Sequence, residues 1–281
     1  MDDSPLILID VSNLAYRCHY TTGKLENGVL FGFFKYILSL EQKLQSTKMV
    51  FCFDTKPYKR SEIYADYKRK GNPKSEEELD DLLECFRQVG LLRNEILRDL
   101  GYANVFWSVG YEADDIIASI EREALVPLTP EIPKLIAVST DKDLYQLLGW
   151  KLDIWNPATN KIYDTKSMVS EWKIAPDYWS KVKAIAGCKT DNITGIKGVK
   201  EKTAIKYILG DLKKSSQAFQ RISVGPEIIE RNLKLTTLPF LGTPRFEINE
   251  DNVTAKRWKG VMTNLELKTL INTCPVAARR F

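Results

Sequence analysis

The chain has 281 residues, of which 44% are hydrophobic, so it can bury one large core or a core with a satellite domain. Its five cysteines form no CxxC motif, which argues against a zinc ribbon, and its single histidine, His19, excludes a zinc site made of several imidazoles. With a net charge of +4, no apolar run near the ~20 residues of a membrane helix and no signal-peptide pattern, we expect a cytoplasmic protein without a membrane partner.

Apolar runs that end in acidic residues recur along the chain. Residues 6–9 lead into Asp10, residues 49–53 into Asp54, and residues 135–140 into Asp141 and Asp143. Residues 152–155 offer one more short strand, and helical patterns separate these runs. This alternation predicts an α/β fold with a parallel sheet, in which the carboxyl ends of the strands share one edge.

A further apolar run, 105–109, leads into Glu112, Asp114 and Asp115 at the mouth of a predicted helix. Acidic residues are common in a first helical turn because they compensate the helix dipole, and that explanation suffices for this stretch alone. Glu112 and Asp115 are three positions apart and would lie on one helical face. Asp114 would be turned away from them by about 100°.

Seven carboxylates therefore converge on one edge of the predicted sheet. Like charges about 4 Å apart repel strongly even at an effective dielectric near 20, so a cation must lie among them. Oxygen ligands favour Mg²⁺ or Mn²⁺, and so many acids suggest two ions, about 3.5–4 Å apart, that clamp a phosphoryl group. The seven acids are Asp10, Asp54, Glu112, Asp114, Asp115, Asp141 and Asp143.

The segment from about 56 to 75 is rich in basic residues and tyrosines. Such a run is usually a solvated surface, but this one follows the strand that ends in Asp54. We interpret it as a flexible arch over the site that contacts phosphates, with tyrosines suited to stack on exposed bases. Its basic residues are Lys56, Lys59, Arg60, Lys68, Arg69, Lys70 and Lys74, and its tyrosines are Tyr58, Tyr64 and Tyr67.

Helical patterns replace the strands beyond residue 156, and residues 181–210 predict a helix, a glycine hairpin and a second helix. The two glycines permit a tight turn whose backbone N–H groups precede a helix N-terminus, which suits a phosphate. A plain helix–helix connection is the alternative, but the lysines and Asp191 favour a hairpin that follows the backbone of duplex DNA. Its predicted DNA contacts are Gly195, Lys197, Gly198, Lys200 and Lys202.

Taken in order, these motifs resemble those of the 5′ nucleases, meaning phage and bacterial flap endonucleases and the 5′ to 3′ exonuclease domain of bacterial DNA polymerase. The resemblance implies a PIN-like core, a helical arch that admits a single-stranded 5′ end, and a helix-hairpin-helix that grips duplex and often holds K⁺. It also implies the strand polarity of cutting. The matching motifs are Leu8-Ile9-Asp10 with Asn13-Leu14 and Arg17, Phe53-Asp54, Arg60-x-Glu62 leading to Tyr67-Lys68, Glu112-Ala113-Asp114-Asp115, Ser139-Thr140-Asp141-Lys142-Asp143, and Asp191-Asn192-Ile193 with Gly195, Gly198 and Lys202-Thr203-Ala204.

The resemblance also implies roles for individual residues. The first ion would be held by Asp10, Asp54, Glu112, Asp114, and Asp141 or Asp143, with Asp115 close by, and the second ion by Asp143 and Asp191. Lys68 matches the arch lysine that contacts the scissile phosphate, and Arg60 resembles its neighbouring clamp. The catalytic residues implied are thus Lys68, Arg60, Asp10, Asp114 and Asp141, and the arch contributes Lys59, Arg69 and Lys70 to DNA binding.

Three positions depart from the family's pattern. Gly71 stands where an arginine is usual, and Arg69 or Lys70 would replace it. Cys188 stands where an aspartate of the second metal site is usual. Lys200 stands where a third hairpin glycine is usual, at the K⁺ site.

We therefore predict a nuclease core over 1–175 and a helical DNA-binding region over 176–281, the latter with further helices at 226–233 and 264–271. The expected protein is a monomeric, structure-specific 5′ nuclease of a bacterial or phage-infected cytoplasm. It would act on DNA at single-strand/duplex junctions, with an RNA primer or RNA/DNA hybrid as a further substrate. The alternatives are a PIN-type ribonuclease and a branched-DNA binding protein with a degenerate nuclease site, for which Cys188 is the best sign.

Overall fold

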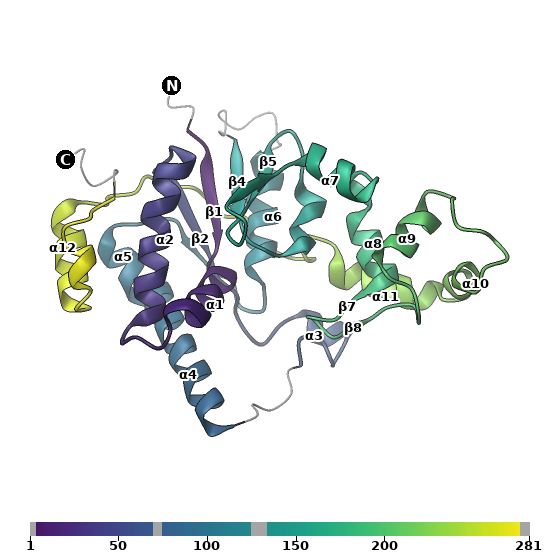
Figure 1. Cartoon of the computed structure of the whole chain (residues 1–281), viewed down its shortest axis with the longest axis horizontal. Coiled ribbons are helices and arrows are strands. Elements are labelled where there is room, and N and C mark those ends of the chain that lie inside the picture. Colours follow the sequence, from purple (N-terminus) through teal and green to yellow (C-terminus); the bar gives the residue numbers. More distant parts are fainter. Residues whose placement is uncertain (1–3, 70–74, 125–133, 276–281) are drawn as a thin grey trace.

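The computed structural model describes residues 4–69, 75–124 and 134–275. A six-stranded sheet in the order β3-β2-β1-β4-β5-β6 forms the centre of one half of the molecule (Figure 1). The first five strands are parallel and β6 is antiparallel to β5, which confirms the predicted parallel α/β sheet. The strands are β1 (Leu6–Asp10), β2 (Met49–Cys52), β3 (Val105–Phe106), β4 (Leu135–Val138), β5 (Leu152–Asn156) and β6 (Lys161–Tyr163).

Helices connect the strands and then continue alone beyond β6. None of those described is long and apolar enough to cross a membrane. The helices are α1 (Val11–Thr22), α2 (Gly28–Leu44), α3 (Arg60–Ile63), α4 (Glu76–Leu91), the π-helix η1 (Leu92–Ile96), α5 (Leu97–Leu100), α6 (Ala113–Ala124), η2 (Lys142–Leu147), α7 (Thr165–Trp172), η3 (Pro176–Tyr178), α8 (Trp179–Ala186), α9 (Glu201–Ile208), α10 (Gln217–Ser223), α11 (Pro226–Thr236), α12 (Ala255–Asn264) and η4 (Lys268–Leu270).

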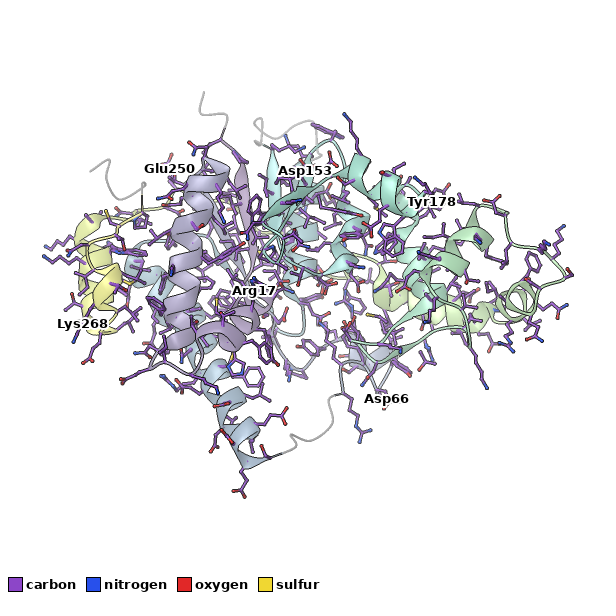
Figure 2. All side chains as sticks on the ribbon, viewed as in Figure 1. Arg17, Asp66, Asp153, Tyr178, Glu250 and Lys268 are labelled. Carbon is purple, nitrogen blue, oxygen red and sulfur yellow. The ribbon has the colours of Figure 1, made fainter. Side chains whose placement is uncertain are left out.

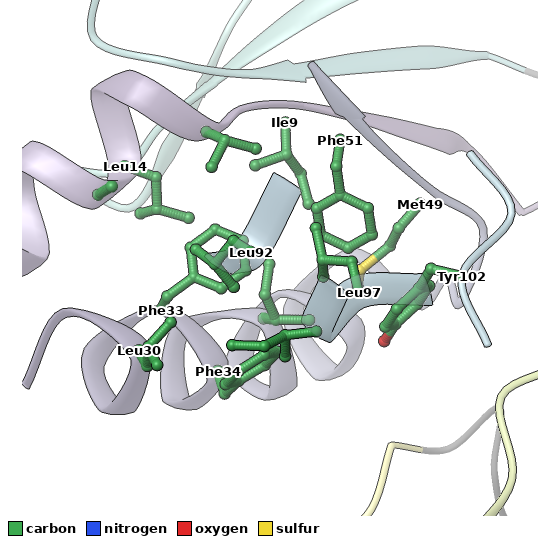
Figure 3. Packing of buried hydrophobic residues seen from close by; sticks show 14 of the residues in the cluster. Ile9, Leu14, Leu30, Phe33, Phe34, Met49, Phe51, Leu92, Leu97 and Tyr102 are labelled. Atoms are coloured by element: carbon green, nitrogen blue, oxygen red, sulfur yellow. The ribbon is translucent and has the colours of Figure 1, made fainter. Parts of the chain in front are cut away.

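Strand β1 is buried on both faces of the sheet. Ile7 and Ile9 belong to the apolar core on one face, and Leu6 and Leu8 belong to the core on the other. A strand covered on both sides has no polar alternation, which is why its sequence is a continuous apolar run. Figure 3 shows the first core, where residues of α2 pack beneath Ile9 and its neighbours from β2 and η1.

The helical half is built around α8, α9 and the small hairpin between them. Strands β7 (Gly187–Cys188) and β8 (Ile193–Thr194) pair antiparallel, and α11 packs along α8. A β-carbon at Gly195 would lie 2.2 Å from the carbonyl carbon of Ala186, so glycine is required where the turn crosses the end of α8. The predicted arrangement of helix, glycine hairpin and helix is present.

The helix predicted near the C-terminus was placed wrongly along the sequence. The helix expected at 264–271 is instead α12, and α12 lies at the opposite end of the molecule from α10 (Figure 1). Trp258 is fully buried, with its ring edge-on to Phe34 of α2 at 5.6 Å between centroids. The side chain of Asn104 also donates a 2.8 Å hydrogen bond to the carbonyl of Asn249. The chain therefore returns from the helical half to complete the core beside the sheet.

Candidate active site

A cavity of about 620 Å³ opens where β1, β2 and β4 end. Five of the predicted carboxylates line it, and each lies at or just after the carboxyl end of a parallel strand or at the start of α6. The fold therefore produces the convergence at one sheet edge that the sequence predicted. The five are Asp10, Asp54, Glu112, Asp114 and Asp141.

Local hydrogen bonds hold these acids in place. Asp10 caps α1, since its Oδ1 accepts from the Asn13 N–H at 3.0 Å, and its Oδ2 accepts from the Ser139 hydroxyl at 2.9 Å. Asp54 accepts from the N–H of Ala113, the first residue of α6, at 2.7 Å. The same carboxylates thus cap helices and line the cavity. Helix capping and metal binding are therefore compatible roles for these residues.

The cavity carries an excess of negative charge that fits a hard cation. Oδ1 of Asp114 is buried and accepts no hydrogen bond from any residue of the described ranges. Burial, followed by the charges of Asp115 and Glu112, raises the pKa of Asp114 well above its usual value. Burial and the charge of Asp54 likewise raise the pKa of Asp10 to about 7. A divalent ion with oxygen ligands would relieve both effects.

Lys68 lies between the cavity and the hairpin. Its backbone has a left-handed φ of 47°, and its N–H donates to the carbonyl of Asp191 at 2.8 Å. Its Nζ lies 2.5 Å from Oε1 of Glu112 and 3.8 Å from Oδ1 of Asp191. Burial would lower the pKa of Lys68, but the charge of Glu112 outweighs this and the pKa is raised well above its usual value. Lys68 is therefore a fixed cation on the cavity wall.

Arg60 and Asp115 face away from the cavity and bind each other. Arg60 is 1% exposed and donates to both oxygens of Asp115, to Glu112 and to the carbonyl of Leu235. Asp115 also accepts from the backbone N–H groups of Glu112 and Phe240. A buried guanidinium cannot reach a substrate phosphate, so the predicted clamp role of Arg60 was wrong. Asp115, predicted as a metal ligand, uses both oxygens within the protein.

Asp143, Cys188 and Asp191 form a second cluster, in which one ligand atom of each lies within 4.8 Å of the others. Cys188 is thus placed among the acids expected at the second metal site. Burial, followed by the charges of Asp143 and Asp191, raises the pKa of the Cys188 thiol to about 12, so it is protonated near neutral pH. This site has two carboxylates and a neutral thiol.

Lys183 lies beside this second cluster, and no role was predicted for it from the sequence. Its Nζ lies 2.9 Å from Oδ1 of Asp143 and 3.5 Å from the sulfur of Cys188. Lys183 is 8% exposed, because α8 turns this side chain inward beside Val182 and Ile185. A lysine within an otherwise apolar stretch of α8 was the available signal.

Aromatic residues supply much of the remaining cavity wall. Tyr58 was expected to meet bases, and it does line the cavity. Tyr67, for which the same role was expected, is instead buried and donates to Oε2 of Glu112 at 2.6 Å. Three further residues of the cavity wall were not predicted from the sequence, namely Tyr16, Phe86 and Arg93. They lie on α1, α4 and η1, where an aromatic residue or an arginine resembles any other helix position.

The predicted DNA contacts fall into two groups. The hairpin lysines are exposed, and Gly198 between them has a left-handed φ of 78°. Arg69 is also exposed, close to Asp66, which is labelled in Figure 2. Lys59 is half-buried and donates to the hydroxyl of Tyr111 at 2.8 Å. Lys70 and Gly71 lie outside the described residues. The exposed hairpin lysines are Lys197, Lys200 and Lys202.

Comparison with known proteins places this site in a family. Residues 5–173 match the family model described as 5′-3′ exonuclease, N-terminal resolvase-like domain. The 5′-3′ exonuclease of Aquifex aeolicus is 28% identical over 95% of this chain and 93% of its own length. The thermostable DNA polymerase I of Thermus aquaticus is 30% identical over 72% of this chain and 23% of its own length. The T5 5′-exonuclease with bound zinc ions shares the fold, with a TM-score of 0.72 and 20% identity over 95% of this chain and all of that one. The chain therefore belongs to the 5′-3′ exonuclease family.

Proposed function

We propose that this protein is a divalent-metal-dependent, structure-specific 5′ nuclease that hydrolyses DNA phosphodiesters near single-strand/duplex junctions. The observation that carries the proposal is the cavity, whose wall holds five carboxylates, the orphan oxygen of Asp114 among them, together with Lys68. Membership of the 5′-3′ exonuclease family supports the polarity of cutting. The names of relatives, 5′-3′ exonuclease and flap endonuclease among them, support the substrate class.

Asp10, Asp54, Asp114 and Asp141 would hold the catalytic ion. Mg²⁺ or Mn²⁺ would polarise the phosphate and lower the pKa of a water molecule there. Lys68 contributes a second positive charge at the cavity wall, placed to contact the scissile phosphate. Its ion pair with Glu112 fixes this ammonium in position before a substrate arrives.

The aromatic wall and the hairpin would position the two parts of a junction. Tyr16, Tyr58 and Phe86 give the cavity flat apolar surfaces, which suit unpaired bases better than a stacked duplex. The hairpin has its own cavity of about 610 Å³ beside exposed lysines, which suits the phosphates of a duplex. We further propose that the protein acts as a monomer, accepts RNA in an RNA/DNA hybrid, and binds K⁺ at this hairpin.

Cleavage of labelled substrates tests the proposal. A 5′-flap DNA and a hairpin RNA are incubated with Mg²⁺ or Mn²⁺, and again after addition of a chelator. We expect metal-dependent cutting of the flap near its junction. Selective cutting of the RNA would favour the PIN-type ribonuclease, and tight flap binding without cutting would favour a degenerate DNA-binding protein.

A further inference from the structure

We propose that the ammonium of Lys183 takes the place of the second divalent ion, so that this chain works with one divalent ion and one built-in cation. The inference rests on the proposed function and changes its metal requirement. Lys183 would act as a positioning residue, holding Asp143 and the hairpin side of the site in the arrangement that a second ion would otherwise impose.

The space at the second cluster is already taken by a cation. A divalent ion there would need the oxygens of Asp143 and Asp191 together with the third position, Cys188. Lys183 Nζ, however, forms an ion pair with Asp143 Oδ1 at 2.9 Å and donates a hydrogen bond to Cys188 Sγ at 3.5 Å. A bound ion would have to displace this ammonium from a position that is 8% exposed.

The second cluster carries less uncompensated negative charge than the first cavity. Its two carboxylates are Asp143 and Asp191, and its third member is the thiol of Cys188. Lys183 lies 2.9 Å from Asp143. Lys68 lies 3.8 Å from Asp191 but 2.5 Å from Glu112, so its charge belongs mainly to the first cavity. One ammonium therefore offsets one of the two carboxylates, and the second carboxylate alone is a weak site for a divalent ion.

The first cavity differs from the second cluster in its net charge and in the chemistry of its ligands. Its five carboxylates share the cavity wall with three basic residues, so an excess of negative charge remains there. Its acidic ligand positions are carboxylate oxygens, whereas the third ligand position of the second cluster is a thiol, which is a poor ligand for Mg²⁺. The three basic residues are Lys56, Lys68 and Arg93.

Ion counting tests this inference directly on the unaltered protein. Mn²⁺ binding is followed by electron paramagnetic resonance, for the free enzyme and for the enzyme saturated with a nicked duplex that mimics the cleavage product. We expect one tightly bound Mn²⁺ per chain in both forms, and a single-turnover cleavage rate that depends on Mg²⁺ with a Hill coefficient near 1. Two bound ions at concentrations that support full cleavage would overturn the inference.

Two variants sharpen the test. In the double variant Lys183→Met with Cys188→Asp, a carboxylate replaces the thiol and the ammonium is gone, so we expect a second bound Mn²⁺ and a Hill coefficient that rises toward 2. Lys183→Arg keeps the charge and should still bind one ion. Lys181→Met on the exposed side of α8 is the matched control and should behave as the unaltered protein. A double variant that folds and still binds one ion would count against the inference.

The two proposals fail in different ways. If the proposed function is wrong, flap DNA stays uncut whatever number of ions is bound. If the function is right and this inference is wrong, cleavage is metal-dependent and two ions are bound by the unaltered protein. The ion count on that protein decides the matter even if the double variant does not fold.

Discussion

The guanidinium of Arg60 and the carboxylate of Asp115 form a fully buried, two-pronged ion pair, with N–O distances of 2.6 and 2.8 Å. Arg60 opens α3 at the base of the predicted arch, and Asp115 lies in the first turn of α6, beside the cavity. Through the carbonyl of Leu235, the same guanidinium also reaches the end of α11. One side chain thus joins the arch, the sheet core and the helical half.

Arg60→Met should therefore destabilise the fold rather than remove a substrate contact. Breaking a buried pair leaves Asp115 charged and uncompensated, at a cost of about 3–5 kcal/mol in the free energy of unfolding. Denaturant unfolding of the metal-free protein measures this, with Arg69→Met, on the exposed turn after α3, as the control. A variant of normal stability that has lost only cleavage would restore Arg60 to the role of a substrate clamp.

Asp114→Asn should abolish cleavage and leave flap DNA binding intact or tighter. The change removes a carboxylate whose Oδ1 has no donor in the described structure, and with it much of the affinity for the ion. We expect the single-turnover rate to fall by ~10²-fold or more, while the metal-free protein becomes more stable because a buried repulsion is lost. Cleavage at the normal rate in Mg²⁺ would show that the ion is held elsewhere.

Lys68→Met should lower the cleavage rate far more than the affinity for DNA. An ammonium that is fixed before substrate binds acts mainly on charge that develops in the transition state, so we expect a loss of about 10²–10³-fold in single-turnover rate and little change in Kd. Arg69→Met, at the exposed neighbouring position, should instead weaken binding slightly. Equal losses in rate and affinity for Lys68→Met would assign Lys68 to ground-state binding.

The raised carboxyl pKa values predict how pH acts on the metal-free protein. Burial and neighbouring acids raise the pKa of Asp10 from 3.8 to about 7 and that of Asp141 from 3.8 to about 6. The folded state then holds these protons more tightly than the unfolded state, so their contribution to stability is full below pH ~4 and is lost as pH rises toward 7. A divalent ion offsets that loss.

Ca²⁺ should thus raise the melting temperature more at pH 8 than at pH 5.5. Thermal unfolding is measured with chelator and with Ca²⁺ at each pH. The gain in melting temperature on adding Ca²⁺ is then compared between the two pH values, so that effects of pH unrelated to the ion cancel. A gain that is equal at both pH values, or larger at pH 5.5, would contradict the assignment of these acids to the ion.

The strand-end acids could be predicted from the sequence because each apolar run stops at its acid, as at Asp10 and Asp54, and parallel strands bring their carboxyl ends to one edge. The ion pairs of Arg60 and Lys183 could not be predicted from the sequence. A basic residue in a basic or apolar stretch does not indicate which distant carboxylate it will bind. The position of α12 could not be predicted either, because its Trp258 packs against Phe34, more than 200 positions earlier in the chain. Short-range pattern fixes strands and caps, whereas these contacts depend on tertiary packing.

The exposed lysines of the hairpin should control duplex binding and not the chemical step. Lys200 and Lys202 lie on the exposed side of the turn into α9, away from the carboxylate cavity that Lys68 borders. Each phosphate contact that is lost should make the slope of log K against log salt shallower by roughly 0.9, so replacing both lysines by alanine should change it by about 1.8. The single-turnover rate at saturating flap DNA should stay the same.

Lys268→Ala provides the matched control, since Lys268 is exposed at the end of the molecule far from the hairpin (Figure 2) and the variant changes the net charge in the same direction. Its salt slope should equal that of the unaltered protein, because a remote charge forms no phosphate contact and is screened beyond ~10 Å at 0.1 M salt. Flap binding measured by fluorescence anisotropy over a series of salt concentrations compares the three proteins. If the hairpin variant lost cleavage rate at saturation while its affinity and slope were unchanged, the hairpin lysines would belong to the catalytic site instead.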